Sequence, residues 1–135
     1  MAKSALATGQ KNVSLNQQDP RLLKFLPHDI FRSTKKLEKF GPYDIVIIDP
    51  PSKQKGSFEA EKDYLRLLKK LSPMLAPNAQ ILACLNAPYL DEQFLVDKMA
   101  EALPDYSLQK RIAHRDDFPE KDTAFNLKMQ LFAKS

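Results

Sequence analysis

The segment YDIVIID, residues 43–49, is the strongest strand signal in the chain and decides the predicted fold. Its residues from Ile45 to Ile48 are all apolar and β-branched, a composition typical of β-strands. Because no polar residue interrupts this run, we expect burial on both faces, as in the centre of a parallel sheet. The strand ends in Asp-Pro-Pro, and a basic loop follows. A buried strand with such a polar, rigid tip suggests a functional site at that tip.

Helices and strands alternate on both sides of this segment. Before it, the sequence predicts a helix, a short buried strand and a second helix, over residues 2–17, 21–27 and 31–41. After it, the sequence predicts a helix, a strand, a helix and two late strands, over residues 58–76, 79–86, 90–103, 106–115 and 124–133. This alternation is typical of an α/β fold with a mainly parallel sheet. The two late strands are expected to pair antiparallel at one edge.

Local signals refine some of these elements. Ser33 or Thr34 can cap the second helix, and Gly41 can end it. In the third helix, apolar residues recur at helical spacing and predict a buried stripe, made of Tyr64, Leu67, Leu68, Leu71 and Leu75. Asp91 and Glu92 begin the fourth helix, where negative charge is favourable.

The length and composition limit the classes of protein to which the chain can belong. The chain has 135 residues, 43% of them hydrophobic and 28% charged, as expected for one globular domain, residues 1–135. No apolar run approaches the roughly 20 residues of a membrane span, and the first residues lack the apolar segment of a secretory signal. The single cysteine, Cys84, fits a reducing compartment, so we expect a cytoplasmic protein without membrane association. The net charge of +4 suits either solvated lysines or an anionic partner.

Several chemistries are disfavoured by residue counts. The chain has two histidines and no Cys/His cluster, so no metal site is predicted. Cys84 lies within an apolar strand, where a packed, inert thiol is expected rather than a nucleophile. Only three glycines are present, and none lie close enough together to form a phosphate-binding loop. No serine nucleophile elbow occurs.

Three predicted strands end in polar side chains, at Asp29, Asp49 and Asn86. In α/β sheets, ligands bind beyond the carboxyl ends of the strands, so these residues are expected to share a cleft. Asp29 either only starts a turn or accepts a hydrogen bond from an amine, such as that of an adenine. Asn86, which both donates and accepts, either fixes one edge of a planar ring or is a loop residue.

The Asp49, Pro50 and Pro51 tip can form a rigid rim of hydrogen-bond acceptors. Proline has no backbone N–H group, so the two prolines remove two donors and fix the chain direction. The Asp49 carboxylate and the nearby carbonyl groups would then suit a planar substrate whose edge offers N–H groups. The alternative is a simple loop that ends the strand.

Beyond the rim, Lys53, Lys55 and Phe58 are candidate substrate contacts. The two lysines can approach phosphates of a nucleic acid or belong to a solvated loop. Phe58 can stack on a base or, as is commoner, open the next helix as a core residue.

These motifs resemble a known family. LPHDIF (residues 26–31), GPYDIVIIDPPSKQKGSF (41–58) and ILACLN (81–86), in this order and spacing, are similar to the class I S-adenosylmethionine-dependent methyltransferases. The likeness is strongest to the branch that modifies bases of ribosomal RNA, whose members carry Asp-Pro-Pro followed by Ser, Thr or Lys. AKSALATGQKN (2–12) resembles the helix that follows the second strand of that branch.

The resemblance implies roles for individual residues. Asp29 matches the acidic residue that binds the adenine amine of S-adenosylmethionine, with His28 and Ile30 beside it. Asp49, Pro50 and Pro51 match the motif next to the transferable methyl group and the target base. The position of the cysteine nucleophile in 5-methylcytosine enzymes falls at Ala87, so the resemblance disfavours that chemistry.

Asn86 fits instead the pattern of enzymes that methylate a base nitrogen, and a guanine nitrogen is our first expectation. The implied partner is RNA, and the implied cofactor is S-adenosylmethionine.

The chain departs from the family in lacking its first two strands. The glycine-rich loop that grips the methionine part of the cofactor and the acid that holds its ribose have no counterpart here. We therefore expect a partial Rossmann-like domain that, by itself, holds half of the cofactor site and lacks full activity. We expect the chain either to close the gap by pairing the strands that end at Asp29 and Asp49, or to form a homodimer through unpaired strand edges.

Three functions follow from these observations. The first is a methyltransferase domain acting on a base nitrogen of RNA. The second is a non-catalytic module that binds RNA or a partner subunit through its basic loop and edges. The third is an inactive fragment.

Overall fold

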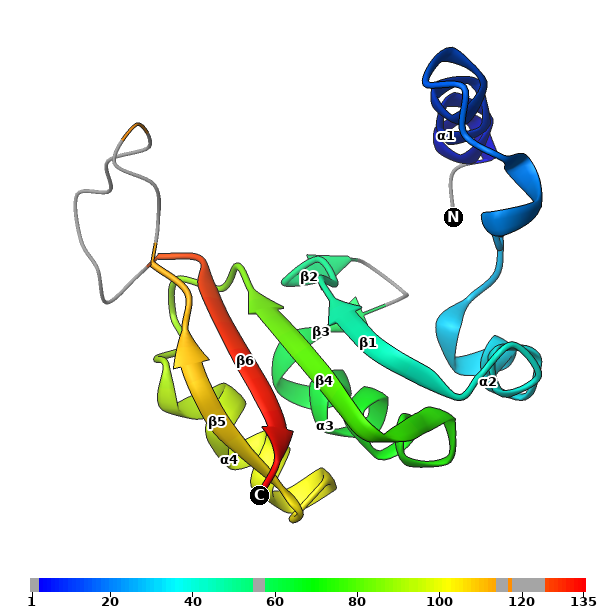
Figure 1. Ribbon diagram of the computed structural model, residues 1–135. Helices are drawn as coiled ribbons and strands as arrows, with labels where there is room; N and C mark the ends of the chain where they lie inside the picture. Colours follow the sequence, from blue (N-terminus) through cyan, green and yellow to red (C-terminus); the bar gives the residue numbers. More distant parts are fainter. Residues whose placement is uncertain (1–2, 55–57, 114–116, 118–125) are drawn as a thin grey trace. The chain divides into compact units, whose positions relative to one another are not determined.

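The computed structural model describes residues 3–54, 58–113, 117 and 126–135. The chain divides into two compact units, residues 1–36 and residues 37–135, which are described separately. Figure 1 identifies the helices and strands of both.

The N-terminal unit contains helix α1 (Lys3–Leu15), the short 3-10 helix η1 (Pro20–Leu22) and most of helix α2 (Ile30–Glu38). Both α-helices were expected, and the structure confirms them. Gly9 of α1 lies against the ring of Phe25, where an added Cβ atom would meet the ring at 2.7 Å. This contact is possible only because glycine has no side chain, and it fixes α1 against the segment that leads to α2.

The buried strand predicted over residues 21–27 is wrong. Residues 21 and 22 belong to η1, and residues 23–27 form no strand. The side chain of Leu22 is 81% exposed and that of Leu23 is 42% exposed. A strand needs a hydrogen-bonded neighbour, and among the described residues this segment has none. The expected pairing of this segment with the strand that ends at Asp49 is therefore wrong as well.

Helix α2 begins one residue earlier than expected and has a different cap. The Asp29 carboxylate accepts a 2.8 Å hydrogen bond from the backbone N–H of Phe31. Ser33 lies inside the helix, and its hydroxyl donates to the carbonyl oxygen of Asp29 at 2.8 Å. The cap is thus Asp29 rather than Ser33 or Thr34, as suits a short carboxylate before the first turn. Gly41 follows the end of the helix as expected, and its N–H donates to the carbonyl oxygen of Glu38.

The C-terminal unit is built on a four-stranded sheet in the order β1-β4-β6-β5. The strands span Tyr43–Ile48, Leu75–Leu85, Lys128–Lys134 and Tyr106–Arg111, respectively. Strand β1 is parallel to β4, whereas β6 is antiparallel to both β4 and β5. Three of the four strands therefore run in one direction, and the antiparallel C-terminal edge confirms the predicted fold (Figure 1).

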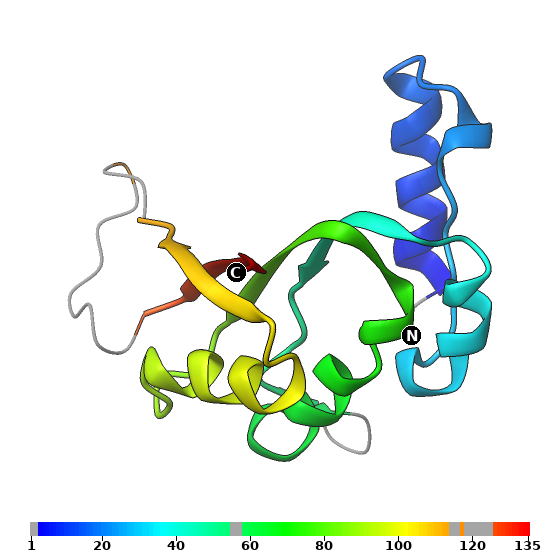
Figure 2. The same ribbon diagram turned by 60° about the horizontal axis from the view of Figure 1, so that its bottom comes forward.

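Two helices cover one face of this sheet. Helix α3 (Ala60–Lys69) and helix α4 (Gln93–Ala102) both lie on the same side, below the strands in Figure 2. Between them and the sheet lies the core, whose largest fully buried side chains include Tyr64, Leu68, Ile81, Leu85, Leu95, Met99 and Phe132. The buried stripe predicted for the third helix is confirmed in α3 at Tyr64, Leu67 and Leu68. Leu71 is buried but follows the end of the helix, and Leu75 begins β4. Pro73 lies in a short 3-10 helix, η2 (Ser72–Met74), because its missing N–H group does not suit a longer α-helix.

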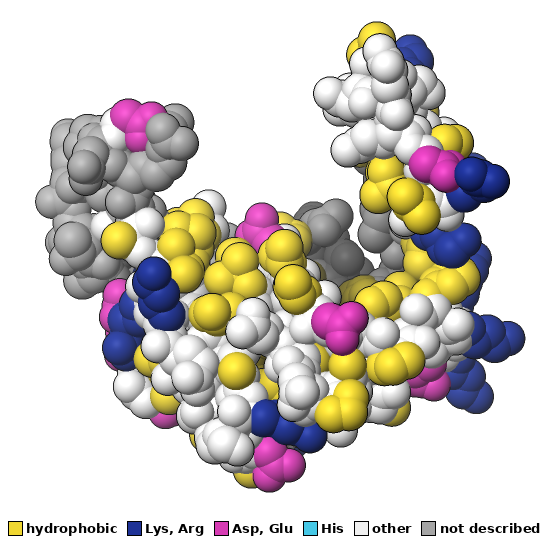
Figure 3. Space-filling view, viewed as in Figure 1, with side chains coloured by type: hydrophobic (Ala, Val, Ile, Leu, Met, Phe, Trp, Pro, Cys, Tyr) yellow, Lys and Arg dark blue, Asp and Glu magenta, His cyan; other side chains and the backbone are white. Residues whose placement is uncertain are grey.

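The expectation that β1 is buried on both faces is wrong. Ile48 is 6% exposed, whereas Ile45 and Ile47 on the other face are 65% and 66% exposed. Within the described residues β1 pairs only with β4, so it forms one edge of the sheet. Figure 3 shows hydrophobic side chains gathered on the sheet face that α3 and α4 leave open. The apolar run identifies the strand correctly, but burial depends on neighbours that this unit does not supply.

Candidate functional site

The tips of β1 and β4 lie side by side because these strands are parallel and paired, with Ile48 opposite Ala83. Asp49 directly follows β1, and Asn86 directly follows β4. Both side chains are exposed. The predicted juxtaposition of these two residues at the carboxyl edge of the sheet is thus present in the fold.

The floor beneath these tips is closed by buried side chains. Tyr64 of α3 is fully buried, and its hydroxyl donates a 3.0 Å hydrogen bond to the carbonyl oxygen of Cys84. Burial raises the pKa of the Cys84 thiol, and the negative charge of Asp49 raises it further. Burial, followed by the charges of Cys84 and Asp49, likewise raises the pKa of Tyr64. Cys84 is therefore a protonated, packed thiol, as expected.

The acceptor role of the rim formed by Asp49, Pro50 and Pro51 stays a prediction. Pro50 and Pro51 offer no N–H groups, and Pro51 is exposed. The backbone carbonyl oxygen of the next residue, Ser52, accepts a 3.0 Å hydrogen bond from the N–H of Ala60. This bond anchors the loop to the start of α3.

A small antiparallel hairpin follows the rim, formed by β2 (Lys53–Gln54) and β3 (Phe58–Glu59). Lys53 is exposed, as a phosphate contact requires, and Lys55 lies outside the described residues. Phe58 is only 5% exposed, and its ring meets that of Tyr64 edge to face. Its position is that of a core residue, the commoner of its two expected roles.

Lys128 is a residue near this edge that sequence analysis did not single out. It is 4% exposed, lies opposite Leu85 in the β4–β6 register, and donates from Nζ to the carbonyl oxygen of Ala87 at 3.1 Å. The ammonium group thus holds the backbone directly after Asn86. Sequence alternation could not have found it, because the apolar residues Met129, Leu131 and Ala133 lie on the other face of β6, whereas residue 128 shares a face with the buried Gln130 and Phe132.

The N-terminal unit holds the residues expected to contact the adenine of the cofactor. Only one carboxylate oxygen of Asp29 is used by the helix cap, and the other has no hydrogen-bond partner among the described residues. Because Asp29 is exposed, that oxygen can accept from an amine, and the adenine-binding role stays a prediction.

The neighbours of Asp29 are also accessible. His28 is exposed and Ile30 is 38% exposed. The Nε2 atom of His28 lies 3.3 Å from Nζ of Lys36. The cleft shared by Asp29, Asp49 and Asn86 stays a prediction.

The described part of the chain contains no group of three or more His, Cys, Asp or Glu residues placed to hold a metal ion. It also contains no helix long and apolar enough to cross a membrane.

The sequence matches the S-adenosylmethionine-dependent methyltransferase family over residues 1–133. The chain belongs to this family. The parallel β1–β4 pair with a polar residue at each tip is therefore part of a methyltransferase fold, and S-adenosylmethionine is the cofactor of the family.

Two comparisons define how much of a methyltransferase the chain represents. It is 28% identical over 87 residues to the ribosomal RNA large subunit methyltransferase K/L of Shewanella loihica, which covers 61% of this chain and 12% of the relative. A protein from Streptococcus mutans described as a SAM-dependent methyltransferase is 25% identical, with a TM-score of 0.84 over 98% of this chain and 36% of that structure.

A further solved structure, SMU.776, is described as a methyltransferase complexed with SAH. It is 24% identical to this chain, with a TM-score of 0.85 over 98% of this chain and 37% of that protein. The chain thus spans about a third of the solved relatives and about an eighth of the curated one.

Proposed function

We propose that the chain forms the target-base side of a methyltransferase that transfers a methyl group from S-adenosylmethionine to a base nitrogen of RNA, with a guanine of ribosomal RNA as the preferred substrate. The observation that carries this proposal is the pairing of β1 with β4, which brings Asp49 and Asn86 to one edge. The similarity to a ribosomal RNA methyltransferase supports RNA as the substrate.

The chemistry of the rim suits a guanine. The Watson–Crick edge of guanine offers N–H donors beside a carbonyl acceptor. The acceptor groups of Asp49 and Pro50 can receive those N–H donors, while the Asn86 amide can donate to the carbonyl oxygen. Lys53 and Lys55 would contact phosphates, which position the RNA without reading its sequence.

Catalysis in this proposal is mainly positioning. S-adenosylmethionine, when bound, supplies an already activated methyl group. The residues of this chain need only hold the acceptor nitrogen in line with that group and exclude water. The hydrogen bond from Lys128 to the carbonyl oxygen of Ala87 supports this task by fixing the backbone beside Asn86.

Methyl transfer to RNA tests the proposal directly. Transfer of a labelled methyl group from S-adenosylmethionine to ribosomal RNA should fall about a hundredfold in Asp49→Ala, because the base loses its alignment. Asp44→Ala is the matched control, since Asp44 is an exposed aspartate at the other end of the same strand. Equal rates for both variants would contradict the role of Asp49.

Cofactor binding tests the role of Asp29. Calorimetry with S-adenosylmethionine should show stoichiometric binding that weakens about tenfold or more in Asp29→Ala, because a hydrogen bond to a charged group is lost. Asp29→Ser should weaken binding equally although serine can still cap α2, so the loss would not come from the helix. Unchanged binding in both variants would show that the carboxylate does not contact the cofactor.

The second candidate is a non-catalytic module that binds RNA or a partner subunit. The open edge of β1 favours it, because unpaired backbone groups can accept a further strand. Salt-dependent RNA binding without binding of S-adenosylmethionine would support the module. Absence of both activities would leave an inactive fragment. A cytoplasmic location stays a prediction.

A further inference from the structure

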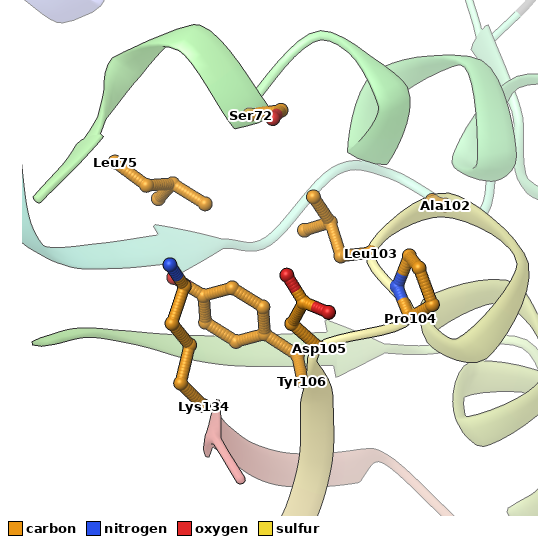
Figure 4. Close-up of a pocket in the computed structure, with 8 residues that line it drawn as sticks. All are labelled: Ser72, Leu75, Ala102, Leu103, Pro104, Asp105, Tyr106 and Lys134. Carbon is orange, nitrogen blue, oxygen red and sulfur yellow. The ribbon is translucent and has the colours of Figure 1, made fainter. Parts of the chain in front are cut away.

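We propose that a pocket at the far end of the sheet from Asp49 and Asn86 binds a small zwitterion of the α-amino acid class. The pocket lies where β4 and β5 begin and β6 ends, and its volume is about 150 Å³. Figure 4 shows the side chains that line it. The candidate methyltransferase site lies instead beyond the ends of β1 and β4, so the two sites are separate.

Tyr106 provides the first indication of a ligand. Its side chain lines the pocket and is 6% exposed, yet its buried hydroxyl has no hydrogen-bond partner within the described residues. A buried hydroxyl without a partner is unfavourable, and an acceptor atom in the pocket would satisfy it. Burial raises the pKa of Tyr106, and the charge of Asp105 raises it further. Tyr106 is therefore an uncharged donor at neutral pH.

Lys134 places a positive charge beside that donor. Lys134 and Tyr106 are directly opposite each other in the antiparallel pairing of β5 and β6, so their side chains project from the same face of the sheet. No ion pair of Lys134 is found among the described residues. The ammonium of Lys134 and the hydroxyl of Tyr106 together form a donor pair that suits a carboxylate.

Asp105 places a negative charge in the same pocket, and Figure 4 shows its carboxylate beside Leu103 and the ring of Tyr106. Its backbone is held on both sides. Its carbonyl oxygen accepts a 3.0 Å hydrogen bond from the N–H of Ser135, and the N–H of Tyr106 donates to the carbonyl oxygen of Leu103 at 2.9 Å.

Asp105 and Lys134 line one pocket without forming an ion pair with each other. A ligand that carries both an ammonium and a carboxylate would neutralise both residues. Both side chains are exposed, so water solvates them in the free chain, and a zwitterion is the class of ligand that can pair with both at once.

The remaining walls limit the size of the ligand. Leu75, Leu103 and Pro104 provide an apolar surface for a short side chain. A volume of about 150 Å³ corresponds to about five water molecules in the liquid, enough for a molecule the size of alanine or serine.

The test is a titration of the ¹⁵N-labelled chain with L-alanine, followed by NMR. Saturable shifts are expected for the backbone amides of residues 103, 105, 106, 134 and 135, with millimolar affinity. Tyr106→Phe should weaken binding about fivefold to tenfold through the loss of one hydrogen bond. Asp105→Asn and Lys134→Met should each weaken it about tenfold or more, because each removes a charged partner. Lys110→Met, which changes another exposed lysine on the β5–β6 ribbon, should bind L-alanine normally.

Three results would overturn the proposal. Absence of saturable shifts would show that no such ligand binds. Acetate or methylammonium binding as tightly as L-alanine would show that only one charge is recognised. Unchanged affinity in Tyr106→Phe would show that the hydroxyl contacts water alone. None of these results would bear on methyl transfer, since Asp49 and Asn86 lie at the other end of the sheet.

Discussion

The hydroxyl of Tyr64 on α3 donates a 3.0 Å hydrogen bond to the carbonyl oxygen of Cys84 on β4. Both residues are buried, so water cannot replace the bond. The bond joins the helix that follows the rim to the strand that ends before Asn86. It thereby links the two chain segments from which the candidate base site is built.

Tyr64→Phe is expected to lower the free energy of unfolding by about 1–2 kcal/mol, because the buried carbonyl oxygen loses its partner. Urea denaturation followed by circular dichroism measures this change. Tyr106→Phe is the matched control, since it removes a buried hydroxyl that has no partner in the described structure. That control should leave the free energy unchanged or raise it. Equal destabilisation by both substitutions would mean that the loss comes from ring packing rather than from the hydrogen bond.

Neighbouring isoleucines of β1 should respond differently to the loss of one methyl group. Ile48→Val is expected to cost about 1 kcal/mol of stability, because Ile48 is 6% exposed. Ile47→Val should cost close to nothing, because Ile47 is 66% exposed. Denaturation midpoints of the two variants measure the difference. Similar costs at both positions would mean that the face of the sheet that is open in the structure is covered in solution.

Cys84 should be alkylated slowly by iodoacetamide in the folded chain and rapidly in denaturant. Only the thiolate reacts, and burial together with the charge of Asp49 raises the pKa of the thiol. The rate should therefore rise with pH. Asp49→Asn should lower the pKa of Cys84 and increase the rate at a given pH. Asp44→Asn, at the start of β1, should not change it. A rate independent of Asp49 would show that the two groups do not interact.

Two copies of the chain are expected to pair through the open edge of β1. An antiparallel pairing centred on Val46 would place Ile45 of each copy opposite Ile47 of the other, so that their side chains contact each other across the new strand pair. Light scattering across a range of concentrations should then show a dimer, and Ile47→Lys should return the monomer. Gln109→Lys on β5, at the other edge of the sheet, is the control. A strict monomer at every concentration would exclude this pairing.

The sequence predicts those features that depend on short-range order. The β-branched run before Asp49 predicts β1, and the rule that the carboxyl ends of parallel strands meet at one edge predicts that Asp49 and Asn86 lie close together, as they do in the structure. Lys128 was not predictable in this way, because the apolar residues Met129, Leu131 and Ala133 alternate on the other face of β6, while the buried face carries Lys128 and Gln130.

The predictions that were wrong concern features that depend on contacts with other parts of the chain. Residues 21–27 have the composition of a strand, but the described chain offers them no neighbour to pair with. The exposure of Ile45 and Ile47 was missed for the same reason, because a run of apolar residues does not show which elements pack against each of its faces. The unpaired hydroxyl of Tyr106 is likewise invisible in sequence, since it depends on which groups the fold leaves out of reach.

The contact between Gly9 and Phe25 has a consequence for how this protein tolerates mutation. Phe25 lies four residues before Asp29, and its ring occupies the space that any other residue at position 9 would need. Gly9→Ala would force the ring of Phe25 to move away from α1. A helix position without any functional group therefore limits which side chains the segment before Asp29 can pack against α1.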